Sequence, residues 1–588
     1  MPYLIDYPYG CTEQTLSRFL PAVIVTKTLM DQGLKPGSIR NKIFGGIETR
    51  HTGKTHPKGK RNIAELDAMT RSGLDRLYDF QHSDGGWSWW KKGDSDHFMT
   101  AYVLWGLTLA QQSGIEVDRN VLGRAYRFLN KELVETEDQH DLQAWILHAL
   151  STYHAATKLK RVDNFQDKAF DNLWKNRSRL NAYTRSPLAL AAHHYRDKKR
   201  AMILIENLEN GVIIDKTPDT SIIQRCLKKS QQGVMATSHW GGEDGIFYRW
   251  SNGGVEATAF ALRALLTIDP KNKLVEPAMN WLIKNRRGAN WSNTRDTAIV
   301  VLAMNDYLKT SGELKGGMEY ELQVNGKTIT TQKVKDVLRA PSRFEIDLAR
   351  IKDGVNTIRL IRKGGEGPLY FAANATFFGL EEPITAAGNE IFVRRQYYKL
   401  VGRPTLLKGY IYDKVPLNDG ETVASGERIE TVLTIEAKNH YEYLVFEDMK
   451  PAGLEAVQIK SGESLYAQEL KQSAVKRALG ESTNLDRLSK KSLRGRRRVK
   501  SAIIPTPPTP NSDYTGRNRG VYQELRDRKV ALFIDKLPQG VWQIRYTLRA
   551  EVPGRFHALP VLGHAMYIPE IRANGAEIRI QVSDNEEE

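Results

Sequence analysis

Apolar residues recur with helical spacing through the first half of the chain. They fall at i, i+3, i+4 and i+7 in segments such as TAYVLWGLTLAQQSG and VEATAFALRALLTI, and short loops rich in Gly and Asp separate these segments. The pattern predicts about ten to twelve helices up to about residue 310, with no strand between them.

Three loops in this helical half carry tryptophan, and each leads into a similar helix start. They contain Trp87 to Trp90, Trp240 with Trp250, and Trp291, and each is followed by Thr or Ala next to small residues. Repeated helical hairpins stack around a common axis, either as an open solenoid or as a closed ring. The spacing permits both, and we favour a closed α/α toroid because a ring needs no capping repeat.

Beyond about residue 310 apolar and polar residues alternate, which is typical of strands. MEYELQVNGKTITTQKV contains the hairpin signal Asn325-Gly326, and RIETVLTIEAKN and KVALFIDKLPQGVWQIRYTLRAEV indicate an antiparallel sandwich. The fold class expected is multi-domain, α then β: an α/α toroid of helical hairpins followed by antiparallel β-sandwich modules. The expected regions are a helical domain at 1–311, a small β unit at 312–385 and a C-terminal β-sandwich at 386–588. The sandwich is expected to contain a basic, Pro-rich insertion at about 468–518.

The chain of 588 residues has a formal net charge of +17, a sign that suits an acidic partner. A dense part of this charge lies in the block 476–500. Recognition of nucleic acid needs a reading helix or aromatics among the basic residues, and this block has no aromatic. We interpret it as a solvated loop, for which an anionic cell surface is the fitting partner, and nucleic acid is not indicated.

Several function classes find no support in the sequence. The two cysteines, Cys11 and Cys226, do not make a disulfide framework, and no C-x-x-C or H-E-x-x-H spacing indicates a metal site. No run of about 18 uncharged apolar residues predicts a transmembrane helix. The N-terminus lacks the basic and apolar regions of a signal peptide. No cofactor is expected, and we interpret Cys226 as a small core residue.

Cys11 stands between a Pro-Tyr-Gly turn and an apolar stripe that predicts a helix, in YPYGCTEQTLSRFLPAVIVTKTL. Gln14 follows three residues later, so the two side chains are close enough to meet at a helix N-terminus. Free backbone N–H groups and the helix dipole lower a thiol pKa at such a position. A thiolate there could attack the side-chain amide of Gln14 and expel ammonia. The product is an internal thioester, which must be shielded from water.

YPYGCTEQ resembles the thioester signature of the alpha-2-macroglobulin and complement family, in which two residues separate cysteine from glutamine and the second is glutamate. Gly10 and Glu13 match this signature. The residue after the cysteine is usually glycine in animal members, and here it is Thr12. This variation looks like bacterial members. SDGGWSWW, VEATAFALRAL and WSNTRDTAIVVLA are similar to the helical thioester domain of that family, and VYQELRDRKVALFIDKLPQGVWQIRYTLRAEVPGRFHALP is similar to the C-terminal domain of bacterial alpha-2-macroglobulins. The resemblance covers most of the chain apart from the basic insertion.

The resemblance implies a non-enzymatic trap for proteases. In the family a target endopeptidase cuts a bait segment, the protein rearranges, and the thioester, here that of Cys11 and Gln14, acylates the attacker once. The resemblance also implies a six-hairpin toroid, the second half of a CUB-like domain at 312–385, and an extracellular, periplasmic or cell-envelope location. Bait and shield precede this region in longer relatives, so upstream macroglobulin domains are expected on a longer or a separate chain.

His97, in DSDHFMTAYV, is the second candidate site residue. Related complement proteins place a histidine near this point as an acyl-transfer catalyst, and an imidazole near Cys11 could accept the acyl group and release a thiolate base. Two alternatives to the trap stay open: a cysteine-dependent acyl-transfer enzyme that uses Cys11 and His97, and a binding module for anionic surface. The position of Gln14 favours the trap, because a cysteine hydrolase does not need a glutamine one turn later.

Overall fold

The computed structural model divides the chain into two compact units. One contains Met1–Lys216 and Met235–Ala375, and the other contains Thr217–Val234 and Thr376–Glu588. The structure describes residues 10–31, 63–158, 162–216, 223, 236–241, 254–286, 290–312, 317–334, 342–365, 369, 371, 373, 375, 383–407, 409–457, 465–471, 474–475 and 513–584. Within these ranges, none of the helices has the length and apolar character needed to cross a bilayer.

Eleven α-helices occupy the described residues up to 312. They are α2 (Thr12–Asp31), α4 (Ile63–Phe80), α5 (His97–Gln112), α6 (Arg119–Glu132), α7 (His140–Thr157), α8 (Asn164–Lys175), α9 (Ala182–His194), α10 (Lys198–Asn210), α11 (Gly254–Ile268), α12 (Val275–Lys284) and α13 (Thr294–Ser311). Six of them form a closed ring, in which α2 contacts α5, α5 contacts α7, α7 contacts α9, α9 contacts α11, α11 contacts α13, and α13 contacts α2.

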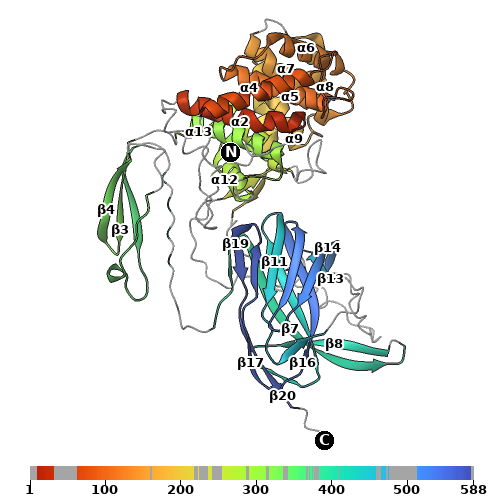
Figure 1. The fold of residues 1–588 in the computed structure, drawn as a ribbon, viewed down its shortest axis with the longest axis vertical. Coiled ribbons are helices and arrows are strands. Elements are labelled where there is room, and N and C mark those ends of the chain that lie inside the picture. Colours follow the sequence, from red (N-terminus) through yellow and green to blue (C-terminus); the bar gives the residue numbers. More distant parts are fainter. Residues whose placement is uncertain are drawn as a thin grey trace, which may run out of the picture. The chain divides into compact units, whose positions relative to one another are not determined.

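The other five helices, α4, α6, α8, α10 and α12, alternate with the ring helices along the chain, and each packs on at least one ring helix next to it in sequence. Figure 1 shows the closure, since α2 lies beside α13 although they are the first and last of the described helices. This arrangement is the α/α toroid predicted from the sequence, and the open solenoid is excluded.

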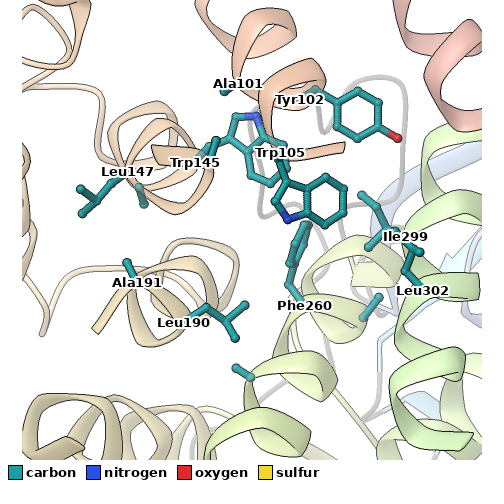
Figure 2. Packing of buried hydrophobic residues seen from close by; sticks show 14 of the residues in the cluster. Ala101, Tyr102, Trp105, Trp145, Leu147, Leu190, Ala191, Phe260, Ile299 and Leu302 are labelled. Carbon is teal, nitrogen blue, oxygen red and sulfur yellow. The ribbon is translucent and has the colours of Figure 1, made fainter. Parts of the chain in front are cut away.

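The ring helix α5 is apolar on nearly all sides, whereas the outer helix α6 carries one apolar stripe. In α5 every residue from Phe98 to Thr108 is buried. The outer helix α6 buries only Val121, Leu122, Ala125 and Leu129. Figure 2 shows aromatic side chains from three ring helices meeting in the interior, where the ring centroid of Trp105 lies 5.7 Å from that of Trp145 and 6.1 Å from that of Phe260. A helix surrounded by other helices must be apolar all round, which explains the difference in pattern.

The three tryptophan loops make the same two contacts, which explains why the sequence repeats them. The indole Nε1 groups of Trp87, Trp240 and Trp291 donate to the carbonyl oxygens of Leu77, Leu208 and Leu282, at 2.7, 2.8 and 2.8 Å. Their backbone N–H groups donate to the hydroxyls of Thr100, Thr258 and Thr297, at 2.8, 3.1 and 3.0 Å. Each tryptophan therefore joins the end of an outer helix to the first turns of the next ring helix.

Gly106 in α5 allows α2 to pack closely on the ring. A Cβ atom at this position would lie 2.6 Å from Leu16 Cδ2 and 3.0 Å from Leu20 Cδ2. We expect Gly106→Ala to lower the free energy of unfolding by about 1–3 kcal/mol in urea titrations, because a packed interface must shift. The matched control is Gly123→Ala in α6, where the nearest atom, Arg127 Nη1, would be 3.7 Å away. This control should be neutral or stabilising by up to about 1 kcal/mol, and equal losses in both variants would contradict the assignment.

One short strand pair interrupts the helical half, where the sequence analysis predicted none. β1 (Ile213–Asp215) pairs antiparallel with β2 (Thr237–His239). Three-residue strands are too short for alternation to stand out in the pattern of apolar and polar positions. β2 ends directly before Trp240, so this pair leads into the second tryptophan loop.

A small antiparallel sheet follows the toroid in the chain. Its strands are β3 (Met318–Val324), β4 (Lys327–Val334) and β5 (Ile358–Gly364), in the order β4-β3-β5. Asn325 and Gly326 form the two-residue turn between β3 and β4, with φ of +50° and +79°. The predicted Asn-Gly hairpin is confirmed, because the tight hairpin turn requires positive φ at both positions.

The second unit is built on a 12-stranded antiparallel sheet. The strands of this unit are β6 (Ala387–Gly388), β7 (Ile391–Thr405), β8 (Gly409–Leu417), β9 (Thr422–Ala424), β10 (Arg428–Ala437), β11 (Tyr441–Asp448), β12 (Leu454–Ala456), β13 (Leu465–Leu470), β14 (Tyr514–Leu525), β15 (Val530–Leu537), β16 (Gly540–Ala550), β17 (Gly554–Ala558), β18 (Leu562–Ala565), β19 (Ile568–Asn574) and β20 (Ile578–Ser583). The sheet runs in the order β6-β19-β18-β11-β15-β14-β13-β16-β10-β7-β8, with β12 beside β16.

The long strand β14 links two halves of this sheet, because it pairs with β13 up to Val521 and with β15 from Tyr522 onward. β7 in one half contacts β18 and β19 in the other, so the halves enclose one apolar core that includes Phe446 and Trp542. A separate sheet, β17-β20-β9, has one parallel pair, between β20 and β9. The antiparallel sandwich expected after the helical part is therefore confirmed. The predicted basic insertion, about 468–518, overlaps the end of β13 and the start of β14, and 476–512 lies outside the described residues.

Candidate functional site

Cys11 and Gln14 lie at the first turn of α2. The helix begins at Thr12, and the backbone N–H of Cys11 donates to Gln14 Oε1 at 3.3 Å. The Cys11 carbonyl accepts from the backbone N–H and the hydroxyl of Thr15, at 2.9 and 2.8 Å. Only 7% of Cys11 is exposed, so the residues around the turn already cover most of it.

The start of α2 is bound to the first tryptophan loop. The backbone N–H of Thr12 donates to the carbonyl of Trp89 at 2.9 Å, and its hydroxyl donates to the carbonyl of Ser88 at 2.6 Å. The first bond satisfies a backbone N–H at the helix N-terminus that has no partner within the helix, and the second gives the Ser88 carbonyl a donor. The Thr12 hydroxyl therefore helps to bind the start of α2 to the tryptophan loop, and a glycine at this position could not make this contact.

Gly10 sits in the turn just before the cysteine. Its carbonyl accepts from Arg76 Nη2 at 2.6 Å. A Cβ atom on Gly10 would lie 2.8 Å from the hydroxyl oxygen of Thr15, which already bonds the Cys11 carbonyl. A larger residue here would displace the threonine that fixes the turn.

Glu13 joins this turn to two neighbouring ring helices. Its carboxylate accepts from Ser17 Oγ at 2.6 Å and from Thr294 Oγ1, at the start of α13, at 3.0 and 2.9 Å. Ser17 also forms a hydrogen bond of 2.9 Å with the hydroxyl of Tyr102 in α5. Burial raises the pKa of the Glu13 carboxyl, and the hydrogen bonds from Ser17 and Thr294 oppose that rise. Glu13 therefore holds the first turn of α2 through side chains of the ring.

A buried ion pair lies beside Glu13. The guanidinium of Arg295 in α13 binds the carboxylate of Glu256 in α11, and their side chains are only 10% and 3% exposed. The hydroxyl of Tyr183 in α9 donates to Glu256 Oε1 at 3.2 Å, and the guanidinium carbon of Arg295 lies 4.5 Å from the ring centroid of Phe98 in α5. All of these residues occupy the first turns of their helices, so the network joins five ring helices at one end of the toroid.

The environment of the thiol differs from the sequence prediction. Burial raises the pKa of Cys11 above its usual value, the backbone N–H of Gln14 opposes the rise, and the charge of Glu13 adds to it. The N–H groups at the helix N-terminus do lower this pKa, as predicted, but the loss of water around a thiolate outweighs them, so the net shift is upward. The resting thiol is therefore protonated at neutral pH.

His97 is the first residue of α5, but its contacts run to the outer helix α6. Its Nε2 lies 3.5 Å from Glu132 Oε2, and its ring centroid lies 5.9 Å from that of Phe128. No hydrogen bond or ion pair among the described residues joins His97 to Cys11 or Gln14. The structure thus brings four of the predicted site residues together at one turn and places His97 among other contacts.

Two other predicted features fall outside this site. Cys226 and the basic block 476–500 lie outside the described residues. In the ranges that are described, no group of three or more His, Cys, Asp or Glu side chains is arranged to hold a metal ion.

Sequence reasoning missed the residues that the closed ring brings to the turn, namely Thr294, Arg295, Glu256 and Tyr183. A signal was present in WSNTRDTAIVVLA and VEATAFALRAL, where Arg295 and Glu256 stand in the first turn of helices that are mostly apolar. Charged residues are buried only when they are paired, so opposite charges at equivalent places in two ring helices predict a pair.

Both the helical part and the β-sandwich of the chain match domains of known families. Residues 1–307 match the A-macroglobulin TED domain, and residues 391–570 match the Bacterial Alpha-2-macroglobulin MG10 domain. The toroid with its Cys-x-x-Gln turn and the sandwich after it thus define a protein of the macroglobulin class. The chain belongs to the alpha-2-macroglobulin family.

Curated relatives are considerably longer than this chain. Alpha-2-macroglobulin of Thermotoga maritima is 26% identical over 347 residues, which cover 57% of this chain and 17% of the relative. Alpha-2-macroglobulin of Escherichia coli is 22% identical over 589 residues, which cover 97% of this chain and 28% of the relative. The chain therefore spans less than a third of the length of these relatives. A crystal structure of native alpha-2-macroglobulin from Escherichia coli, from domain MG7 to the C-terminus, is 16% identical, with coverage of 99% of this chain and 74% of that one and a TM-score of 0.37.

Proposed function

We propose that this chain is the C-terminal part of an alpha-2-macroglobulin-like endopeptidase trap that acylates its target once, through a thioester between Cys11 and Gln14. The observation that carries the proposal is the buried turn in which the backbone N–H of Cys11 binds the side-chain oxygen of Gln14 at 3.3 Å. A donor at that oxygen would stabilise the negative charge that develops there when the thiol attacks the amide carbon. Membership in the family supports the same reading.

The chemistry balances without a cofactor. Cys11 Sγ bonds to the amide carbon of Gln14, the carbon–nitrogen bond breaks, and ammonia leaves with the proton of the thiol. Later a lysine amine or a hydroxyl of the protease attacks the same carbon, and the thiol is released. A thiol with a raised pKa is a poor leaving group, so burial keeps the thioester slow to react. Exposure would lower that pKa and make the bond more reactive.

The partners follow from the trap. They are target endopeptidases, bound covalently, and upstream macroglobulin domains that would supply bait and shield on a longer or separate chain. The proposed location is extracellular or in the periplasm or cell envelope, where such proteases act. The anionic-surface alternative rests on the charge of 476–500 alone.

The enzyme alternative needs a base beside the thiol. His97, the base suggested by the sequence, lies beside Glu132 instead, with 3.5 Å between its Nε2 and Glu132 Oε2. An acyl-transfer role for His97 in the open protein remains a proposal, which His97→Ala would test as a change in the ratio of hydroxyl to amine acceptors.

Intact mass spectrometry of the freshly purified chain, with and without methylamine, tests the proposal. The expected native mass is short by one ammonia, and methylamine adds once at Gln14 while a thiol becomes titratable. Cys11→Ala and Gln14→Glu are the controls, and each should show its full calculated mass and no methylamine adduct. A full native mass with a freely titrating thiol would overturn the claim that this chain builds the thioester. Turnover of an acyl substrate would favour the enzyme instead.

A further inference from the structure

A groove opens in the second unit where the two halves of the large sheet separate. β14 pairs with β13 up to Val521 and with β15 from Tyr522 onward. The pairing of β15 with β14 ends at Phe533, although β15 continues to Leu537, so the two strands diverge there. The groove has a volume of about 1010 Å³ and is lined by residues of β11, β13, β14 and β15 together with Met566.

Three tyrosine rings from three different strands line this tyrosine groove. Tyr443 of β11, Tyr466 of β13 and Tyr522 of β14 are 46%, 49% and 67% exposed. Tyr443 has a φ of +53°, a conformation that aromatic residues rarely adopt and that concentrates at binding sites. Its carbonyl accepts from the backbone N–H of Met566 at 2.9 Å, which holds this geometry. A groove with several tyrosine rings suits a ligand that presents apolar rings together with hydrogen-bond acceptors.

One carboxylate in the tyrosine groove has no cation beside it. Asp535 is exposed, and within the described ranges no lysine or arginine pairs with it. The next residue, Lys536, lies 3.9 Å from Glu442, and Glu447 binds Lys529. A carboxylate that is not neutralised, at the side of an aromatic groove, favours a ligand that also carries positive charge.

One segment of this chain has both features. Residues 505–510 read PTPPTP, and the stretch 494–500 before them contains five basic residues. Proline-rich sequences favour the polyproline II helix, which binds in aromatic-lined grooves and loses little conformational entropy on binding. The segment stands between β13 and β14, and both strands line the groove, so it is held near the groove at a high effective concentration. A free partner peptide would have to compete with this tethered segment.

The length of chain between the proline run and the groove also fits. Pro505 stands nine residues before Tyr514, the first residue of β14, a span of about 28 Å at the rise of a polyproline II helix. Tyr522 stands eight residues after Tyr514, a span of about 26 Å along the strand. The residues after the proline run, Asn511 and Ser512, are of the kind that forms turns. A segment that turns back beside β14 therefore reaches the groove with its first prolines.

We propose that the tyrosine groove binds the proline-rich segment 505–510 of the same chain in the polyproline II conformation. The proline rings lie against Tyr466 and Tyr522, and the tyrosine hydroxyls donate to carbonyl groups that have no partner inside a polyproline II helix. The basic stretch 494–500 then comes within reach of Asp535. The insertion is thus a ligand of the sandwich that carries it, and this interaction does not depend on the thioester.

Site-specific photo-cross-linking of the full chain tests the inference. Tyr522 is replaced by the photoreactive residue p-benzoylphenylalanine, which keeps an aromatic ring in the groove, and peptide mapping by mass spectrometry identifies the segment that it captures. The expected cross-link falls within 501–512 and has the same yield at every protein concentration, because it forms inside one chain. The matched control places the same residue at Tyr410 of β8, which is 68% exposed and does not line the groove, and this control should not capture 501–512.

A second variant separates docking from mere proximity. Replacing the four prolines of 505–510 with glycine keeps the tether, its length and its charge, but a glycine chain has no preference for polyproline II. The yield of the cross-link from position 522 to this segment should fall by about fivefold or more. An unchanged yield in the glycine variant overturns the inference, because the tether alone then explains the capture. A cross-link to another part of the chain, a cross-link whose yield rises with protein concentration, or no cross-link at all also overturns it.

Discussion

Replacing Glu256 with Gln is expected to lower the free energy of unfolding of the helical toroid by about 3–5 kcal/mol, because the buried guanidinium of Arg295 loses its carboxylate. Glutamine has nearly the same shape as glutamate, and its side-chain oxygen can still accept a hydrogen bond from the Tyr183 hydroxyl. The loss of stability therefore measures the removal of the negative charge and not the creation of a cavity. Urea titration followed by far-ultraviolet circular dichroism measures the change, since the toroid holds all of the α-helices longer than one turn that the structure describes.

A double-mutant cycle makes this result specific. Arg295→Met should also cost several kcal/mol, whereas the double variant should cost less than the sum, because removing both charges leaves neither one buried alone. The surface pair of Lys91 with Asp79, at 2.6 Å and more than half exposed, is the control, and Asp79→Asn should cost less than about 1 kcal/mol. Additive losses in the cycle would contradict an energetically coupled pair.

The same variants connect stability to chemistry. Thr294, the residue before Arg295, donates to Glu13, so loosening the start of α13 also loosens the turn that carries Cys11. We therefore expect Glu256→Gln to reduce the fraction of protein that incorporates methylamine at Gln14 under conditions where the toroid is still folded.

The sequence predicted what depends on short-range patterns. Periodicity separated helices from strands, the Asn325-Gly326 turn identified its hairpin, and the spacing of Cys11 and Gln14 placed them within one turn, where the structure finds them in contact. Each of these features is decided by residues close together in the chain. The closed ring followed from the repeat of helical hairpins, although the spacing alone also permitted a solenoid.

The remaining features depend on contacts between distant segments. Thr294 reaches Glu13 only because α13 closes the ring onto α2. The direction of the Cys11 pKa shift depends on burial, which a local reading of a helix N-terminus does not include.

Acid is expected to unfold the toroid through two buried histidines. Desolvation lowers the pKa of His194 from 6.5 to about 3, and it lowers the pKa of His148 well below 6.5, with His194 and Arg263 adding to the effect. Above pH 6.5 both groups are neutral in the folded and unfolded states, so stability there does not depend on them. Below pH 6.5 only the unfolded chain takes up the protons, and stability falls by about 1.4 kcal/mol per pH unit for each histidine. Between pH 6.5 and 4.5 the two together remove about 5 kcal/mol, a large part of the stability of a domain.

Charge and packing around these rings account for the shifts. The ring of His148 lies 6.0 Å from Phe260 and 5.9 Å from His194 between centroids, and neither of its nitrogens has a hydrogen-bond partner in the described part of the chain. The guanidinium of Arg263, which binds Asp306 at 2.7 Å, is close enough for its positive charge to oppose protonation of both histidines. His194 Nδ1 has a hydrogen-bond partner, Ser151 Oγ at 3.1 Å, but burial and the neighbouring positive charge still oppose protonation of both rings in the folded state.

His148→Phe isolates one of the two contributions. The substitution places an aromatic ring of similar size among Trp105, Trp145 and Phe260 and removes two nitrogens that have no hydrogen-bond partner in the described part of the chain. The free energy of unfolding at pH 8 should therefore change little or rise. At pH 5 the variant should be more stable than the parent by about 2 kcal/mol, because one proton-binding site of the unfolded chain is gone. His564→Gln in the second unit is the control and should leave the pH dependence of the helical transition unchanged. Parallel pH curves for the parent and His148→Phe would show that His148 is not the group that makes the ring sensitive to acid.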